Sequence, residues 1–160
     1  TEINKSGKEN KIVEDKDIGA NEHVNEVLNN NYTDYYAGKY IDNNGNNVVL
    51  LCEDNAANRK QICSILGITE SKTKFKKATY SYEYLTKLQD KISKAMQNKE
   101  LTFVVSSALM EDTNKIKVTV INNSNENIDK LKALDPKGGA IEIEYNEKGM
   151  ATQDLLVNAE

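Results

Sequence analysis

LTFVVSSALMEDTNKIKVTVINNSNENIDKLKALDPKGGAIEIEYN, the stretch from residue 101 to residue 146, decides the fold. Two apolar runs flank a short polar turn, an amphipathic run follows, and a run of strictly alternating residues ends the stretch. Alternation with a period of two predicts strands, whereas apolar residues spaced three and four apart predict a helix. The stretch therefore has the order strand, strand, helix, strand.

The same order is found earlier in the chain, from about residue 36 to residue 80. Here YYAGKYID and VVLLCED flank the turn NNGNN, and NAANRKQICSILGI and TKFKKATYS follow. A single unit of this size buries its apolar face poorly, so an internal repeat predicts two units. We expect an α+β fold with two ββαβ repeats, small antiparallel sheets and helices packed on them. A long helix over about residues 82–98 joins the repeats.

The domain organisation follows from this repeat. Residues 1–16 are charged and poor in apolar side chains, which predicts a disordered leader. Residues 17–98 form the first unit, with a short helix before it and the linker helix after it. Residues 99–146 form the second unit, and residues 147–160 a mobile tail.

Short polar signals mark the ends of the expected helices. Asp54 or Asn55 should cap the helix of the first repeat, and Gly67 lies where its C-terminal cap belongs. In the second repeat, Asn123 and Glu126 have the spacing of a capping box.

Composition excludes several classes of function. The formal net charge of −4 argues against a general affinity for nucleic acid. Lysines at positions 72, 74, 76 and 77 predict a solvated strand edge protected from aggregation. No run of about 18 apolar residues occurs, so we expect no membrane span. The polar start TEINKSGKENK fits a chain trimmed of a signal peptide, and so an extracellular or cell-surface location.

No catalytic or cofactor site is indicated by the residue pattern. His23 is the one histidine and lies in the leader, and Ser106-Ser107 has no nucleophile motif around it. Cys52 and Cys63 lack zinc-site spacing. They form either a strand-to-helix disulfide or two buried thiols, and the second interpretation is favoured. We therefore predict a protein without enzymatic activity, cofactor or metal.

A calcium loop beginning at Asp42 is the one metal site that the spacing suggests. Asp42, Asn44, Asn46 and Glu53 fall at ligand positions of an EF-hand. The required glycine is missing at the sixth position, and apolar residues 48–51 occupy the later ones. A hairpin turn is the better interpretation.

The segment YYAGKYIDNNGNNVVLLCED resembles the opening of the pro-region of streptogrisin and α-lytic-protease type secreted serine proteases. TYSYEYLTKLQDKISKAM is similar to the helix after the third strand of that family, and DTNKIKVTVIN to a turn and strand of its second half. The matching positions in the first segment are Tyr36, Ala37, Gly38, Tyr40, Ile41, Asp42, Gly45, Val48 and Val49. The resemblance covers about residues 32–146.

This resemblance implies two α/β subdomains that act as a folding catalyst and tight inhibitor of a protease. Such action uses a matching surface, partly through strand pairing, and needs no catalytic residues. No protease domain follows residue 160, so we expect a stand-alone relative whose partner is a secreted serine protease or another protein. The residues expected to bind the partner lie on a pairing edge of the second repeat: Ile116, Val118, Val120, Ile141, Ile143 and Tyr145.

A rival interpretation comes from a different class of protein. The chain is rich in tyrosine, and these rings could line a groove between the two sheets of a small-ligand or cell-wall binding domain. The tyrosines concerned are Tyr32, Tyr35, Tyr36, Tyr40, Tyr80, Tyr82 and Tyr84. Packing in the core explains most of them equally well. The sequence predicts no oligomeric state.

Overall fold

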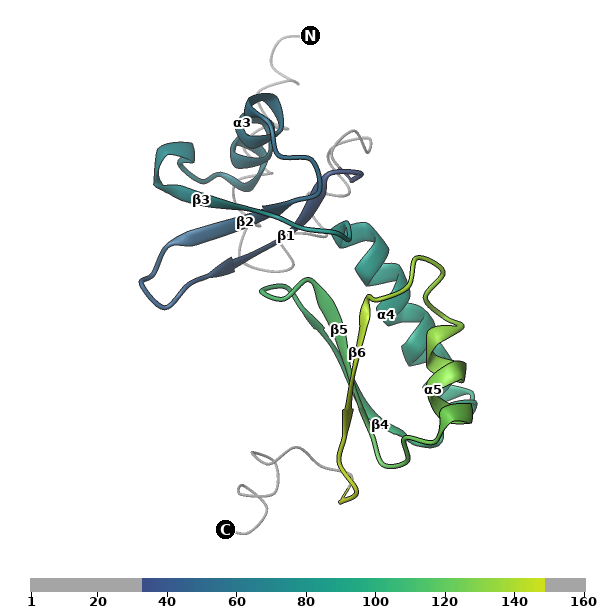
Figure 1. Ribbon diagram of the computed structural model, residues 1–160. Coiled ribbons are helices and arrows are strands. Elements are labelled where there is room, and N and C mark those ends of the chain that lie inside the picture. The colour runs from purple at the N-terminus through teal and green to yellow at the C-terminus, as the bar shows by residue number, and fades with distance from the viewer. Residues whose placement is uncertain (1–32, 149–160) are drawn as a thin grey trace, which may run out of the picture. The chain divides into compact units, whose positions relative to one another are not determined.

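The computed structural model of the protein describes residues 33–148. The chain divides into two compact units, of which the first ends at Glu83 and the second begins at Tyr84 (Figure 1). The leader expected over residues 1–16, the short helix expected within residues 17–30 and residues 149–160 of the expected tail lie outside the described residues. The α+β fold class is confirmed, and the order of elements repeats as the sequence predicts.

The first unit begins with a hairpin of strands β1 (Tyr36–Ile41) and β2 (Asn47–Leu51), which pair antiparallel. Asp42 holds the turn between them, because its carboxylate accepts hydrogen bonds from the backbone N–H groups of Asn44 and Asn46, both at 2.9 Å. Gly45 has φ = +81°, a conformation that glycine adopts without strain. The predicted hairpin turn is thus confirmed.

Helix α3 (Ala56–Leu66) follows, with both of its ends where the sequence places them. The Asn55 side chain accepts a hydrogen bond from the backbone N–H of Asn58 at 2.8 Å, and Gly67 closes the helix with φ = +66°. A short 3-10 turn, η1 (Glu70–Lys72), then leads into strand β3 (Thr73–Lys77).

Strand β3 pairs parallel to β2, and the sheet order is β1-β2-β3. The expectation of purely antiparallel sheets is therefore wrong, since each sheet is mixed. The physical reason is the crossover: a helix between two neighbouring strands carries the chain back to the end at which it started. The second sheet repeats this pattern, with β6 parallel to β5.

The core of the first unit lies between its sheet and α3. Val49 and Leu51 of β2 pack with Ile62 and Cys63 of α3, and Phe75 of β3 borders this cluster. Val48 and Leu50 alternate with these residues and are buried too, so β2 is apolar on both faces. Cys52 and Cys63 are not joined by a disulfide; Cys63 is buried whereas Cys52 is half-buried, so the favoured interpretation of two buried thiols holds for Cys63 alone.

The second unit contains the long helix α4 (Tyr82–Gln97), which begins at the boundary, and the strands β4 (Val104–Met110), β5 (Lys115–Val120) and β6 (Ile141–Tyr145). The sheet order is β4-β5-β6. Helix α5 (Asn125–Lys132) connects β5 to β6. A register shift near the start of β4, between Val104 and Ser106, matches the one in β1 between Tyr36 and Gly38. This shared irregularity is further evidence that the two units are repeats of one another.

The N-cap of α5 is Ser124 rather than the predicted Asn123. Ser124 Oγ accepts a hydrogen bond from the backbone N–H of Asn127 at 3.3 Å. The Ser124 backbone N–H donates a hydrogen bond to the Asn122 side chain. The N-cap is therefore one residue later than the capping box predicted at Asn123.

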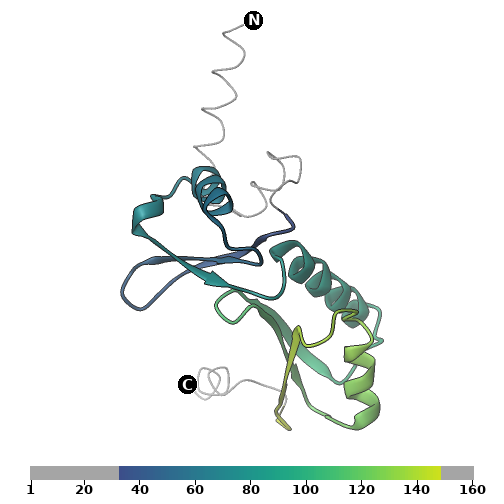
Figure 2. The ribbon, with the colours of Figure 1, turned by 45° about the horizontal axis from the view of Figure 1, so that its top comes forward.

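Helices α4 and α5 cover one face of the second sheet (Figures 1 and 2). The Gln89 side chain of α4 donates a hydrogen bond to Ser107 Oγ at 3.1 Å, and Ser107 is the register partner of Val118. The face with Val118 is therefore the one covered by helices. Within residues 33–148, no helix has the length and apolarity needed to cross a membrane.

Candidate interaction surfaces

Within residues 33–148, strand β6 forms an open edge of the second sheet. Ile116 donates its backbone N–H to Ala140 at 2.8 Å, and Asn146 donates its own to Val120 at 2.9 Å. In a parallel ladder such bonds involve every second residue, so Ala140, Glu142, Glu144 and Asn146 face β5. The N–H and C=O groups of Ile141, Ile143 and Tyr145 consequently point outward and are available for another strand.

The six residues predicted to bind a partner fall on two different strands. Ile116, Val118 and Val120 belong to β5, which is the central strand of the sheet, and all three are fully buried. The expectation that β5 forms part of a pairing edge is therefore wrong, because both of its sides already carry neighbouring strands. The sequence could not reveal which strand is central, because apolar residues alternate in the same way in β5 and β6. The position of each strand in the sheet depends on the crossover between them.

Ile141, Ile143 and Tyr145 belong to β6, and their binding to a partner stays a prediction. The two isoleucines are half-buried, whereas Tyr145 is 50% exposed. Tyrosine contributes strongly to many protein interfaces because it combines a large apolar ring with a hydroxyl group. The exposed ring at the end of an open strand thus favours contact with a protein.

The opposite face of β6 carries the acidic residues Glu142 and Glu144. Lys117 of β5 forms an ion pair with Glu144 at 2.7 Å, and this hydrogen-bonded contact raises the pKa of the lysine. Both partners are exposed, so the pair adds little to stability. The face of this sheet edge that lies away from the helices is polar and acidic.

The start of β6 is fixed by a buried carboxylate in the preceding loop. Asp135 accepts hydrogen bonds from the backbone N–H groups of Ala140 at 2.8 Å and Gly138 at 3.2 Å, and from the hydroxyl of Tyr84. The Tyr84 oxygen in turn accepts the N–H of Lys137 at 3.1 Å. No local sequence pattern indicated this anchoring role.

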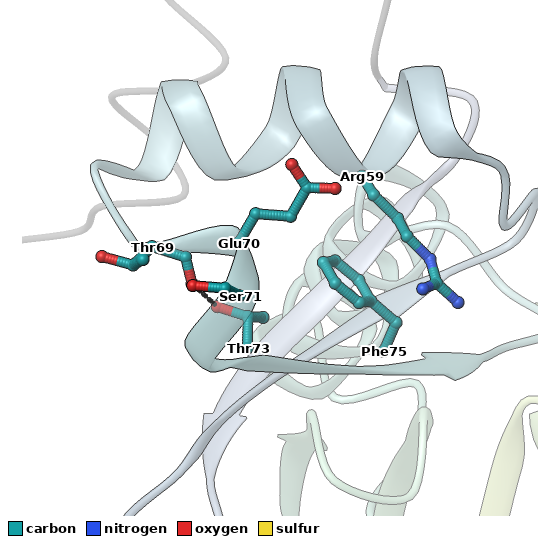
Figure 3. Close-up of a pocket in the computed structure, with 6 residues that line it drawn as sticks. All are labelled: Arg59, Thr69, Glu70, Ser71, Thr73 and Phe75. Atoms are coloured by element: carbon teal, nitrogen blue, oxygen red, sulfur yellow. Dashed lines mark hydrogen bonds between the residues drawn. The ribbon is translucent and has the colours of Figure 1, made fainter.

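A second candidate surface is a shallow, open hollow in the first unit, with a volume of about 590 Å³ (Figure 3). Its lining comes from α3, from the η1 turn and from β3: Arg59, Thr69, Glu70, Ser71, Thr73 and Phe75. The Arg59 guanidinium lies 4.5 Å from the centre of the Phe75 ring and binds Asp54 through two nitrogens, at 2.5 and 2.8 Å. These contacts hold the arginine in place along the wall of the hollow.

The lining of this hollow was not predicted. Arg59 and Phe75 are sixteen positions apart and come from different elements, so no local pattern connects them. The lining contains no tyrosine. Tyr35, Tyr36 and Tyr80 are buried, Tyr40, Tyr82 and Tyr84 are half-buried, and Tyr32 lies outside the described residues. The alternative of a small-ligand or cell-wall binding groove between the sheets stays a prediction.

Acidic and thiol side chains do not gather into a metal site in the described part of the chain, where no group of three or more histidine, cysteine, aspartate or glutamate side chains is placed to hold an ion. The only candidate from sequence, Asp42, uses its carboxylate on the turn and on Lys74 at 3.1 Å. These hydrogen bonds, chiefly the one from the Asn46 backbone, lower the pKa of Asp42 to about 2.

Comparison with known families gives one match. A family model described as a Pro-like N-terminal domain matches residues 4–78, which includes the strands and helix of the first unit. This is similar to the expectation of a pro-region, although the match does not identify a protease family. No curated protein matches the chain.

Proposed function

We propose that the chain is a non-enzymatic, exported interaction module that resembles a protease pro-region and acts as an inhibitor or folding assistant of a secreted serine protease. The open backbone of β6 is the observation that carries this proposal. The match of residues 4–78 to a Pro-like N-terminal domain supports it at the level of the domain class.

The proposed mechanism is the addition of a partner strand to β6. The outward N–H and C=O groups of Ile141, Ile143 and Tyr145 give main-chain hydrogen bonds, and the side chains that alternate with them give specificity. The loop held by Asp135 supports the first residue of the strand, so the edge is already in the extended conformation. An edge that is ordered before binding loses less conformational entropy on association.

Titration into a panel of secreted trypsin-like proteases tests the proposal. We expect the chain to slow at least one of them at sub-micromolar concentration and to speed the refolding of the same protease after denaturation. Uniform inactivity across the panel, in both measurements, would overturn the proposal.

A pair of variants tests whether β6 is the surface involved. Tyr145→Pro removes an outward N–H without breaking a bond to β5, and its φ is compatible with an edge strand. Tyr145→Ala removes only the side chain. We expect Tyr145→Pro to abolish inhibition and Tyr145→Ala to weaken it. Retained inhibition by Tyr145→Pro would assign the contact to another surface.

A further inference from the structure

Strand β3 is one of the two edge strands of the first sheet, and its charge is opposite to that of β6. Ala78 donates its N–H to Leu51 at 2.9 Å, so the parallel ladder uses Lys74, Lys76 and Ala78. The N–H and C=O groups of Phe75 and Lys77 point away from β2. Among residues 33–148 no strand lies on this side of β3.

The side chains of β3 alternate between the two faces of the sheet, and Lys77 shares the α3 face because it is the register partner of Leu51. Phe75 lies on the face covered by α3, because it is the register partner of Val49 and packs with the same cluster. Lys74 and Lys76 lie on the opposite face and are exposed. Residues 70–77 hold four lysines and one glutamate, in a chain whose formal net charge is −4. Residues 70–77 are thus a locally basic segment of an acidic chain.

Strand β6 shows the complementary arrangement. Ile143 is the register partner of Val118 and shares the face covered by helices, whereas Glu142 and Glu144 lie on the opposite face. If β3 and β6 paired with their helices on the same side, lysines would lie across from glutamates on one face. On the other face Phe75 would lie across from an isoleucine, which is a favourable cross-strand pair.

We propose that a second copy of this chain is the partner of the β3 edge: β3 of one copy pairs with β6 of another copy and joins two sheets of three strands into one. Pairing of β3 with β3, or of β6 with β6, would place like charges opposite each other and is disfavoured. The contact is therefore heterologous, with unlike surfaces meeting. The assembly keeps one unused β3 edge at one end and one unused β6 edge at the other, so association continues as concentration rises.

The hollow beside β3 is consistent with this occupant. It lies on the α3 face next to Phe75 and Thr73, where the side chains of an added strand would project (Figure 3). Arg59 and Glu70 provide one charge of each sign there, together with the hydroxyl groups of Thr69 and Ser71. An exposed tyrosine such as Tyr145 has both the ring and the hydroxyl group to use such a lining.

Sedimentation velocity of the full chain, from micromolar to millimolar concentration, tests the proposal without any protease. We expect the weight-average mass to rise with concentration and the rise to weaken in high salt, because exposed charges are screened. Lys76→Glu and Glu142→Lys each reverse one exposed charge, and each should weaken association about fivefold or more. Lys91→Glu, on the exposed side of α4, is the matched control and should leave association unchanged.

The decisive variant carries both Lys76→Glu and Glu142→Lys in one chain. The two reversals restore opposite charges across the contact, so self-association should return toward that of the unchanged chain. Loss of folding could not produce such a recovery. A chain that stays monomeric at all concentrations overturns the proposal, as does a double variant that associates no better than the single ones.

A peptide with the sequence GAIEIEYNE, from residues 139–147, gives an independent measurement. We expect it to bind the full chain more tightly than it binds the Lys76→Glu variant, and a scrambled peptide should not bind. Binding of the peptide to a chain that remains monomeric would show an edge open to foreign acidic strands and would refute the second copy as its occupant. Failure of protease inhibition leaves each of these outcomes unaffected.

Discussion

Replacing Asp135 with alanine should lower the free energy of unfolding of the second unit by about 3 kcal/mol. The carboxylate is buried and accepts three hydrogen bonds, two of them from the backbone that leads into β6. Ala140 is fully buried, so its N–H would lose its acceptor without access to water. An unsatisfied buried donor costs about 1–3 kcal/mol, and we assign about 2 to this group. The donors of Gly138 and Tyr84 add about 1 more.

Urea unfolding followed by circular dichroism measures this loss, and hydrogen exchange at the Ala140 amide locates it. Tyr84→Phe removes one of the three donors and should cost about 1 kcal/mol. Asp129→Ala deletes an exposed carboxylate of α5 and should change stability by less than about 0.5 kcal/mol. If Asp135→Ala were as stable as Asp129→Ala, with unchanged exchange at Ala140, the anchoring role of this carboxylate would be refuted.

Three further predictions concern other parts of the molecule. The hydrogen bonds to Asp42 lower its pKa from 3.8 to about 2, so their contribution to stability is present above pH 4 and is lost as the pH falls toward 2. In an NMR titration, the chemical shift of the Asn46 amide should change over this pH range. The Asp42→Asn variant should show no such change. Burial raises the pKa of the Cys63 thiol, so iodoacetamide should modify Cys52 first in the folded chain and both thiols equally in urea. Mass spectrometry measures the two rates of modification. Equal rates for Cys52 and Cys63 in the folded chain would contradict this prediction. Ile92→Ala empties a fully buried site in α4 and should cost about 3 kcal/mol in urea unfolding, whereas the adjacent exposed Lys91→Ala should be neutral.

The local structure could be predicted from sequence because its causes are local. Asn55 and Gly67 bracket α3 as expected, since a capping amide and a residue with positive φ are needed at those positions. The alternation in residues 141–145 gave β6 its bounds, because a half-exposed strand requires it. The Asn-rich hairpin turn was predicted for the same kind of reason.

The order of strands in each sheet could not be predicted in this way. Whether β5 or β6 lies at the edge depends on the crossover through α5, and alternation is the same for both strands. The role of Asp135 was also beyond local patterns, because its donor Tyr84 is 51 positions away. The polar groups that support the candidate surface could therefore be identified only from the tertiary structure.

The two proposed contacts of β6 compete, and this competition can be measured. A partner strand and a second copy would use the same outward groups of Ile141, Ile143 and Tyr145, so each excludes the other. By mass action, the apparent affinity for a protease should fall as the total concentration of the chain rises into the range of self-association. The Lys76→Glu variant keeps β6 intact but associates poorly, so its affinity for the protease should stay constant over that range. An affinity that falls equally for both chains would show that β6 is not shared between the two contacts.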